Sequence, residues 1–499
     1  MLRAVDERDA YANLVLPQIL RERRLSERDA ALATELTYGT LRGRGIYDAV
    51  LGLCSDRPVD RIDPALLDTL RLGAHQLLRT RVPAHAAVAT TVNLARAHVG
   101  EGPARFANAI LRKVTSRDLD AWLEIAAPPA ADDAVGHLSV VHSHPRWIVS
   151  ALRDAVGGDA DATAALLAAD NAAPGVTLVA KPGQATAEEL AEAGATPAAW
   201  SPYGAYLASG DPSRVRAVAE GRAAVQDEAS QLVALTLATA PTLAPPAEEA
   251  PHPGPGAKPS PDRPRTQAAD APAADAPGAG PGPAEHAAAG SPVSAGPGEP
   301  GTGVWLDMCA GPGGKASVLA GIAGERGAVL LAADAGIGRA GLARRALDGA
   351  VANGTAAVVA ADGTEPVWRP GAFDRVLVDA PCTGLGALRR RPEARWRRGP
   401  ESVPELSGVQ RRLLTAALDA VRPGGVVAYV TCSPHLAETR VVVDDVLRGR
   451  TDIETLDAPS ILATALDDPP DLDPGPYLWL WPHRHGTDAM FCALLRRHP

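Results

Sequence analysis

The sequence predicts a multidomain protein: an all-α N-terminal domain, a small α+β linker module and a C-terminal α/β domain of the doubly wound, Rossmann-like type. Three observations predict this. Apolar residues recur with helical spacing over residues 1–117, short apolar runs alternate with helical segments after residue 303, and a glycine-rich turn opens that second pattern. The 499 residues suffice for several domains, and a hydrophobic content of 46% can fill real cores.

The first predicted domain, residues 1–117, shows no strand pattern. Leu66 and Leu70 lie one helical turn apart, and Pro64 stands where a helix would begin, with Asp63 as a plausible cap. We therefore expect a helical bundle over this range.

Residues 118–240 show a mixed pattern, which predicts a small α+β module. Residues 176–180 read as a short strand, residues 187–193 as a helix, and the segment near Tyr206 as a second strand. The polar cluster of residues 225–232 precedes an apolar helix and is expected at the mouth of the next domain.

Residues 241–302 are rich in Pro, Ala and Gly and contain almost no large apolar side chains. Such a segment cannot bury enough surface to offset the entropy lost on ordering. We expect a disordered insertion that the chemistry does not need, because the cost of closing a flexible loop grows slowly with its length.

Residues 303–499 alternate between strands and helices. Strands are expected at 304–307, 328–334, 357–362, 373–379 and 425–431, helices at 339–353 and 410–421, and a closing hairpin at 477–481 and 489–495. In open α/β sheets, ligands bind at the carboxyl ends of the strands. The acids at those ends are therefore expected around one crevice: Asp307, Asp334, Asp362 and Asp379.

The turn between the first of these strands and its helix, residues 309–315, suits a nucleotide-like ligand that approaches bare backbone N–H groups. A P-loop would need glycine in place of Cys309 and Ser or Thr in place of Ala316. The dinucleotide fingerprint does not fit the spacing of the glycines either. A third possibility, an S-adenosylmethionine site, is not decided by this loop alone.

The five cysteines are too few for a disulfide scaffold, and no Cys-x-x-Cys pair indicates structural zinc. Cys54 and Cys492 read as small buried hydrophobic residues. Cys309, Cys382 and Cys432, in contrast, lie in turns at strand ends, where function is usually built. Without an apolar N-terminal segment or a long apolar run, we expect a soluble cytoplasmic protein that does not enter a membrane.

The net charge of −10 is by itself weak evidence against binding to nucleic acid, because such binding depends on local positive charge. Six arginines cluster between Arg389 and Arg398. The cluster is either a solvated surface loop or a contact for phosphate groups.

Two thiols at one crevice suit the methylation of a pyrimidine. Carbon-5 of cytosine or uracil is too weak a nucleophile to take a methyl group unaided, but a thiolate that adds to carbon-6 makes carbon-5 nucleophilic. An acid such as Asp379 can hydrogen-bond N3 and the exocyclic amine. Spacing alone does not rank Cys432 above Cys382 as the nucleophile.

Three motifs resemble a known family: Asp307-x-Cys-Ala-x-Pro-Gly-Gly-Lys315, Asp379-Ala-Pro-Cys-x-Gly384 and Thr431-Cys-Ser433. In this order they are similar to those of the RNA cytosine-5 methyltransferases of the NOL1/NOP2/Sun family. Residues 70–77 and 106–113 resemble the NusB-like RNA-binding domain, which points to the bacterial members that act on 16S rRNA. The resemblance covers nearly the whole chain except residues 241–302.

The resemblance implies a class I methyltransferase that moves a methyl group from S-adenosylmethionine to carbon-5 of a cytosine in 16S rRNA. It implies that Cys432 is the nucleophile, that Cys382 assists breakdown of the covalent adduct, and that Asp379 also acts in catalysis. The implied cofactor contacts are Cys309, Ala310, Gly311, Pro312, Gly313, Gly314, Lys315, Asp334, Arg339, Asp362 and Asp379. The implied RNA contacts are Arg390, Arg391, Arg395, Trp396 and Arg397.

Three positions depart from the family's pattern: Gly311 replaces a usual alanine, Ala316 a usual threonine, and Thr439 the asparagine that commonly follows the glutamate. The first helix also begins abruptly at Met1, so part of it is expected to be missing. The partners implied are S-adenosylmethionine and 16S rRNA, with no metal and no membrane, and we expect a monomer. The alternatives are a tRNA cytosine-5 methyltransferase and a non-catalytic NusB-like RNA-binding factor.

Overall fold

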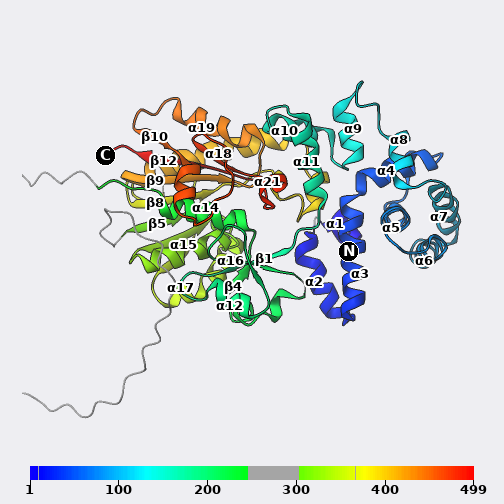
Figure 1. The fold of residues 1–499 in the computed structure, drawn as a ribbon, viewed down its shortest axis with the longest axis horizontal. Helices are drawn as coiled ribbons and strands as arrows, with labels where there is room; N and C mark the ends of the chain where they lie inside the picture. Colours follow the sequence, from blue (N-terminus) through cyan, green and yellow to red (C-terminus); the bar gives the residue numbers. More distant parts are fainter. Residues whose placement is uncertain (9, 209, 245–302, 366) are drawn as a thin grey trace, which may run out of the picture.

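The computed structural model describes residues 1–8, 10–208, 210–244, 303–365 and 367–499. Figure 1 shows helices of the N-terminal part on one side and a large sheet with its covering helices on the other. The insertion expected at 241–302 lies, beyond residue 244, outside the described residues. In the part of the chain that is described, no helix is long and apolar enough to cross a membrane.

The N-terminal part is all-helical, as expected. Asp63 caps α5 by accepting from the N–H groups of Ala65 and Leu66, and Pro64 is the first residue of that helix. The helices are α1 (Leu2–Arg8), α2 (Ala12–Arg23), α3 (Glu27–Arg42), α4 (Arg44–Cys54), α5 (Pro64–Arg79), α6 (Ala84–His98) and α7 (Glu101–Val114). Apolar side chains of α4, α5 and α7 form their own core.

The next stretch begins with four more helices and ends in a small antiparallel sheet. The helices are α8 (Leu119–Ala126), α9 (Ala134–Val141), α10 (Arg146–Ala155) and α11 (Ala160–Asn171). The sheet has the order β2–β3–β1–β4, from β1 (Val176–Ala180), β2 (Thr196–Pro197), β3 (Gly204–Leu207) and β4 (Ala223–Val225), with α12 (Ala187–Glu192) and α13 (Arg216–Ala219) beside it. The strands at 176–180 and near Tyr206 are confirmed, whereas β2 and β4 are too short to show an alternating pattern.

The C-terminal domain is built on an eight-stranded sheet of order β10–β12–β9–β8–β5–β6–β7, with β11 paired to β12. Five strands run parallel, and β10, β11 and β12 add antiparallel pairs at one side. The strands are β5 (Val304–Asp307), β6 (Val329–Asp334), β7 (Ala356–Ala360), β8 (Phe373–Asp379), β9 (Val421–Thr431), β10 (Ile453–Leu456), β11 (Tyr477–Leu480) and β12 (Met490–Arg497). The closing hairpin is confirmed as β11 and β12.

Two predicted helices differ from the observed ones. The helix expected at 339–353 is divided at Leu347 into α16 (Ile337–Ala346) and α17 (Asp348–Ala352). The helix expected at 410–421 is α18 (Ser402–Ala420), because Val421 already pairs with Phe373 as the first residue of β9. Strand β10, followed by α20 (Ala458–Thr464), was not predicted.

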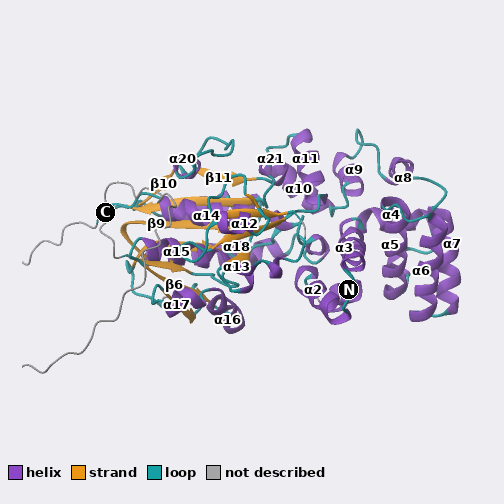
Figure 2. Cartoon of the chain, turned by 60° about the horizontal axis from the view of Figure 1, so that its bottom comes forward, coloured by secondary structure: helices purple, strands orange, loops and turns teal. Residues whose placement is uncertain are grey.

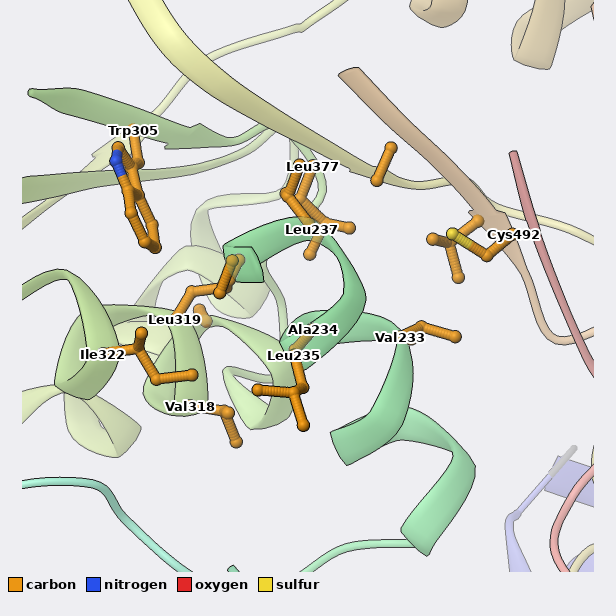
Figure 3. Close-up of a cluster of buried hydrophobic side chains, with 14 of the residues drawn as sticks. Val233, Ala234, Leu235, Leu237, Trp305, Val318, Leu319, Ile322, Leu377 and Cys492 are labelled. Atoms are coloured by element: carbon orange, nitrogen blue, oxygen red, sulfur yellow. The ribbon is translucent and has the colours of Figure 1, made fainter. Parts of the chain in front are cut away.

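The helix before the insertion, α14 (Glu228–Thr239), packs into the core of the C-terminal domain. Its apolar residues lie against α15 (Gly314–Glu325) and against strands of the eight-stranded sheet. Figure 3 shows this for Leu235, Leu237 and Leu319. The insertion therefore separates two helices that share one core.

The sheet changes direction of winding at its first strand. Strand β5 has β6 on one side and β8 on the other, so the crossovers that follow β5 and β7 lead to opposite sides of it. This is a topological switch point, where ligands of open α/β sheets bind beyond the carboxyl ends of the strands. Asp307 and Asp379 end the two central strands at that point.

Candidate active site

The glycine-rich turn after β5 is held by an acid and an arginine from the next βα unit. The N–H of Gly311 donates to Asp334 Oδ2 at 3.0 Å, and Arg339 Nε donates to the same oxygen at 3.0 Å. A Cβ atom on Gly311 would lie 2.7 Å from this oxygen, so alanine at this position requires the carboxylate to shift. Gly313 has a φ of +114°, and its missing side chain makes room for Ala346. The turn and Asp334 thus form one hydrogen-bonded unit.

Two buried side chains beside this turn carry polar atoms without a hydrogen-bond partner among the described residues. Asp307 is fully buried, and burial, with the nearby charge of Asp379, raises the pKa of its carboxyl to about 8; its Oδ2 is unpaired. Gln226 is 7% exposed, and neither end of its amide has a partner. Its Nε2 lies 3.4 Å from the place where a Cβ of Gly314 would be. Because buried polar atoms are normally paired, these unpaired atoms mark the turn as a candidate site for a polar ligand.

Gln226 was not among the predicted cofactor contacts. The polar cluster of residues 225–232 pointed to this region, but no spacing rule places a residue before the insertion against a turn after it. Asp362, which was predicted, is exposed just beyond the end of β7, where hydrogen bonds from Thr364 lower the pKa of its carboxyl.

Cys382 and Cys432 are brought together by parallel strands β8 and β9, which end at Asp379 and Thr431. Their sulfur atoms lie 3.5 Å apart, both partly buried. Cys309, by contrast, lies in the glycine turn; burial raises the pKa of its thiol well above the ordinary value. The pair therefore consists of Cys382 and Cys432.

The surroundings of the two thiols differ. The contact with the Cys382 thiol lowers the pKa of Cys432; burial and the charge of Asp379 oppose this shift, and the cations of Lys315 and Arg391 favour it. The same contact, together with burial and the carboxylate of Glu438, raises the pKa of Cys382 well above its usual range. The surrounding charges thus lower the pKa of Cys432 and raise that of Cys382, whereas the contact between the two sulfur atoms is by itself symmetric.

Lys315 links the glycine turn to the thiols. Its ammonium lies 2.9 Å from Asp379 Oδ2. Burial lowers the pKa of this lysine, but Asp379 and Cys432 outweigh it and the pKa is raised. Lys315 therefore stays protonated, holds Asp379 in place and contributes positive charge beside Cys432.

Glu438, which is fully buried, fixes the two cysteine loops against each other. It accepts from the backbone N–H of Thr383 at 2.8 Å and from the Thr383 hydroxyl, on the Cys382 side. It accepts from the hydroxyl of Ser433 at 2.6 Å on the Cys432 side, and from Gln410 at 3.2 Å. Four donors thus converge on one carboxylate, three from the two loops and one from α18. Thr439, the departure noted above, instead donates to the carbonyl of His435 at 3.1 Å within the same turn.

The arginine cluster is mostly engaged within the protein. Arg390 pairs with Asp488. Arg395 is fully buried and donates to Asn171 Oδ1 at 2.8 Å and to the carbonyl of Asp170 at 2.9 Å, and burial lowers its pKa to about 10. The expected RNA contact is therefore wrong for Arg395 in this structure, since its guanidinium joins the catalytic domain to the helices.

The other members of the cluster lie nearer the surface. Arg44 lies over the ring of Trp396 at 5.7 Å, which ties that ring to the helical part. Arg397 donates to the carbonyl of Ala10. Arg391 is exposed and forms no ion pair with the described residues. An RNA contact stays a prediction for Arg390, Arg391, Trp396 and Arg397. Across the described ranges, no group of three or more His, Cys, Asp or Glu side chains could hold a metal ion.

Comparison with known proteins gives two family matches. Residues 297–496 match the family model "16S rRNA methyltransferase RsmB/F", and residues 1–116 match the NusB family. These matches confirm the resemblance drawn from the motifs and from the helical N-terminal part.

Similar proteins extend over nearly the whole chain. A putative methyltransferase of Mycobacterium tuberculosis strain H37Rv is 46% identical over 497 residues, which are 99% of this chain and 94% of that protein. The probable ribosomal RNA small subunit methyltransferase B of Bacillus subtilis is 25% identical, with 99% and 96% covered. The crystal structure of PH0851 has a TM-score of 0.69 at 20% identity and covers 96% of this chain and 93% of that one, so the two share a fold.

We predict that Lys315→Met slows alkylation of Cys432 at neutral pH. Removal of the cation raises the pKa of the Cys432 thiol, so a smaller fraction is thiolate at pH 7. The measurement is the rate of iodoacetamide labelling of the Cys432 peptide across pH, read by mass spectrometry. In Lys113→Met, an exposed lysine of α7, the profile should stay at that of the wild type. An unchanged profile in Lys315→Met would contradict the assignment.

Proposed function

The chain belongs to the RsmB/F family of 16S rRNA methyltransferases, and we propose that it transfers a methyl group to carbon-5 of a cytosine in 16S rRNA through a covalent adduct with Cys432. The observation that carries the proposal is the 3.5 Å contact between two thiols whose pKa values are shifted in opposite directions. The proposed reaction uses one thiolate at carbon-6 of the cytosine and a second thiol near carbon-5, so it requires two neighbouring thiols of different pKa.

The cofactor of this enzyme family is S-adenosylmethionine. When bound, it supplies an electrophilic methyl group. The residues present fit this cofactor. Gln226 offers an unpaired donor and an unpaired acceptor at the start of α15, and the turn at Gly311 has no side chain to cover its backbone. Asp334, held at the end of β6 beside this turn, is placed to accept from ribose hydroxyls. An amide suits both the carboxylate and the ammonium of an amino acid moiety.

The nucleophile in this proposal is Cys432. Its lowered pKa increases the thiolate available at neutral pH, and addition to carbon-6 turns carbon-5 into an enamine carbon that can bond to a methyl group. Asp379, held by Lys315, acts on the pKa of Cys432, and its carboxylate can accept hydrogen bonds from the exocyclic amine and from the ring nitrogen once that nitrogen is protonated.

Cys382 has its role after methyl transfer. Carbon-5 then carries both a proton and a methyl group; loss of the proton restores the ring double bond and expels Cys432 as thiolate. In the free enzyme the hydrogen bond to Cys432, burial and the negative charges of Cys432 and Glu438 raise the pKa of Cys382. Once Cys432 is bonded to carbon, its hydrogen bond and its charge no longer act on Cys382. The Cys382 thiol then gives its proton to water, and the resulting thiolate takes the proton from carbon-5.

The direct test is methyl transfer from labelled S-adenosylmethionine to unmodified 16S rRNA. We expect 5-methylcytidine with the wild type and none with Cys432→Ala. Cys382→Ala should instead accumulate a protein–RNA adduct, because release fails. Cys54→Ala, a buried thiol of the helical part, controls for the loss of a cysteine elsewhere. Transfer to tRNA alone would change the substrate, and no transfer to any RNA would favour a non-catalytic binding factor.

A second prediction concerns Gln226 and the amino acid moiety of the cofactor. We expect Gln226→Ala to weaken binding of S-adenosylhomocysteine by about tenfold, since roughly 1–2 kcal/mol follows from losing a hydrogen bond to a charged group. Binding of methylthioadenosine, which lacks the amino acid end, should change little. Isothermal titration calorimetry measures both. Gln76→Ala, in α5, is the matched control. Equal losses for the two ligands would show that Gln226 acts only through the fold.

A further inference from the structure

The two thiols of the site are close enough to react with each other. The sulfur atoms of Cys382 and Cys432 lie 3.5 Å apart, and a disulfide bond holds its sulfur atoms at about 2.05 Å. The loops that carry them leave adjacent strands, because Asp379 of β8 pairs with Val430 of β9. Neighbouring strands lie about 4.8 Å apart, which is within the range of backbone separations that a disulfide bridges. Rotation of the two side chains can therefore close the remaining gap.

The backbones of the two loops are also tied to each other. The N–H of Gly386, in the loop after β8, donates to the carbonyl of Cys432 at 2.9 Å. Gly386 has no Cβ atom, and one added there would lie 2.9 Å from the same oxygen, so the missing side chain permits this close approach. Glu438 adds the bonds that it accepts from both loops. The loops are thus held at a distance from which the thiols can bond without opening the fold.

The five cysteines differ in access and in ionisation. Cys382 and Cys432 are partly exposed, whereas Cys54 and Cys492 are buried. Cys309 is partly exposed too, but burial of its thiol raises the pKa well above the ordinary value. Cys432 has a lowered pKa, so the thiolate that attacks an oxidant is present at neutral pH. Ready ionisation, access and a second thiol within reach are the properties of cysteines that sense oxidants.

We propose that Cys382 and Cys432 form a reversible disulfide bond when a hydroperoxide oxidises the protein, and that this bond stops methyl transfer. The bond itself rests on the position of the two thiols. Its effect on methyl transfer rests on the proposed function.

The bond forms in two steps, written here for hydrogen peroxide. The Cys432 thiolate attacks one peroxide oxygen; the O–O bond breaks, the S–O bond of a sulfenic acid forms, and hydroxide leaves, so sulfur loses the two electrons that peroxide gains. The Cys382 thiol then attacks this sulfur; the S–S bond forms, the S–O bond breaks, and the departing hydroxide takes the Cys382 proton as water. A dithiol reverses the oxidation by exchange, in which it gives up two hydrogens and becomes a disulfide itself.

The disulfide protects the site while it inactivates it. With both sulfur atoms bonded, neither Cys382 nor Cys432 is free to add to carbon-6 or to accept the carbon-5 proton. The same bond keeps the Cys432 sulfur from further oxidation to sulfinic acid, which thiol reductants do not reverse. Reduction therefore restores the protein in its active form.

The first test treats the purified full chain with hydrogen peroxide, blocks the remaining thiols with N-ethylmaleimide in denaturant, and maps the unreduced tryptic peptides by mass spectrometry. Cys382 and Cys432 fall in separate peptides, residues 376–389 and 413–440, which contain no other cysteine. We expect these two peptides to be joined, and to separate after dithiothreitol. Cys54 ends α4, which Figures 1 and 2 both show away from the sheet, so its peptide should carry the maleimide. A bond from Cys432 to another cysteine, or no bond, would overturn the proposal.

The second test asks whether Cys382 makes the oxidation reversible. In Cys382→Ala the sulfenic acid of Cys432 has no partner, so excess peroxide should carry it to sulfinic acid, and dithiothreitol should not restore the free thiol. In the wild type and in the control Cys54→Ala, nearly all of the Cys432 thiol should return. Equal recovery in Cys382→Ala would contradict the proposal. If the joined peptides form while methyl transfer is undiminished, the bond stands and the proposed function of the two thiols fails instead.

Discussion

The active site depends on one buried carboxylate. Glu438 accepts hydrogen bonds from Thr383 in the loop after β8 and from Ser433 in the loop after β9, so it sets the distance between Cys382 and Cys432. A buried carboxylate is costly unless its oxygens are satisfied, and here the donors of both loops meet that need. Tyr429 adds a further bond, from its hydroxyl to the carbonyl of Glu438 at 2.7 Å. Movement of either loop would remove hydrogen bonds from this buried carboxylate.

The charged residues near the thiols come from segments that also serve another purpose. Lys315 comes from the glycine turn, so the segment that surrounds the cofactor also supplies the cation beside Cys432. The arginine segment is shared between structure and reaction: Arg389 lies between Asp227 and Asp488, which ties the residues before α14 to the C-terminal strands, while Arg391 remains exposed at the crevice. Neighbouring arginines of this segment therefore have different tasks: Arg389 joins the domains, and Arg391 contributes to the site.

Much of the fold follows from the sequence, because its signals are local. Glycine turns, strand-terminal acids and helical periodicity placed β5, β6, β8 and the N-terminal helices correctly. Contacts between distant segments were not predictable: α14 joins the core across the insertion, and Arg395 is buried among helices that precede it by more than two hundred residues. Gln226 was missed for the same reason, since its role depends on what lies beside it in space. The sequence pointed to two reactive thiols but could not distinguish them, because the charges that shift their pKa values differently, Glu438 for Cys382 and Lys315 for Cys432, come from distant parts of the chain.

The central claim, that Cys432 is the nucleophile and Cys382 its partner, is tested most directly with RNA that carries 5-fluorocytidine at the target position. Fluorine cannot leave carbon-5 as a proton does, so the adduct formed by the attacking thiol persists after methyl transfer. Mass spectrometry of the digested adduct then identifies the cysteine attached to the ring. The account predicts that the nucleotide is found on the Cys432 peptide, in the wild type and in Cys382→Ala alike. A nucleotide on Cys382 would contradict it, and would reverse the roles assigned to the two loops.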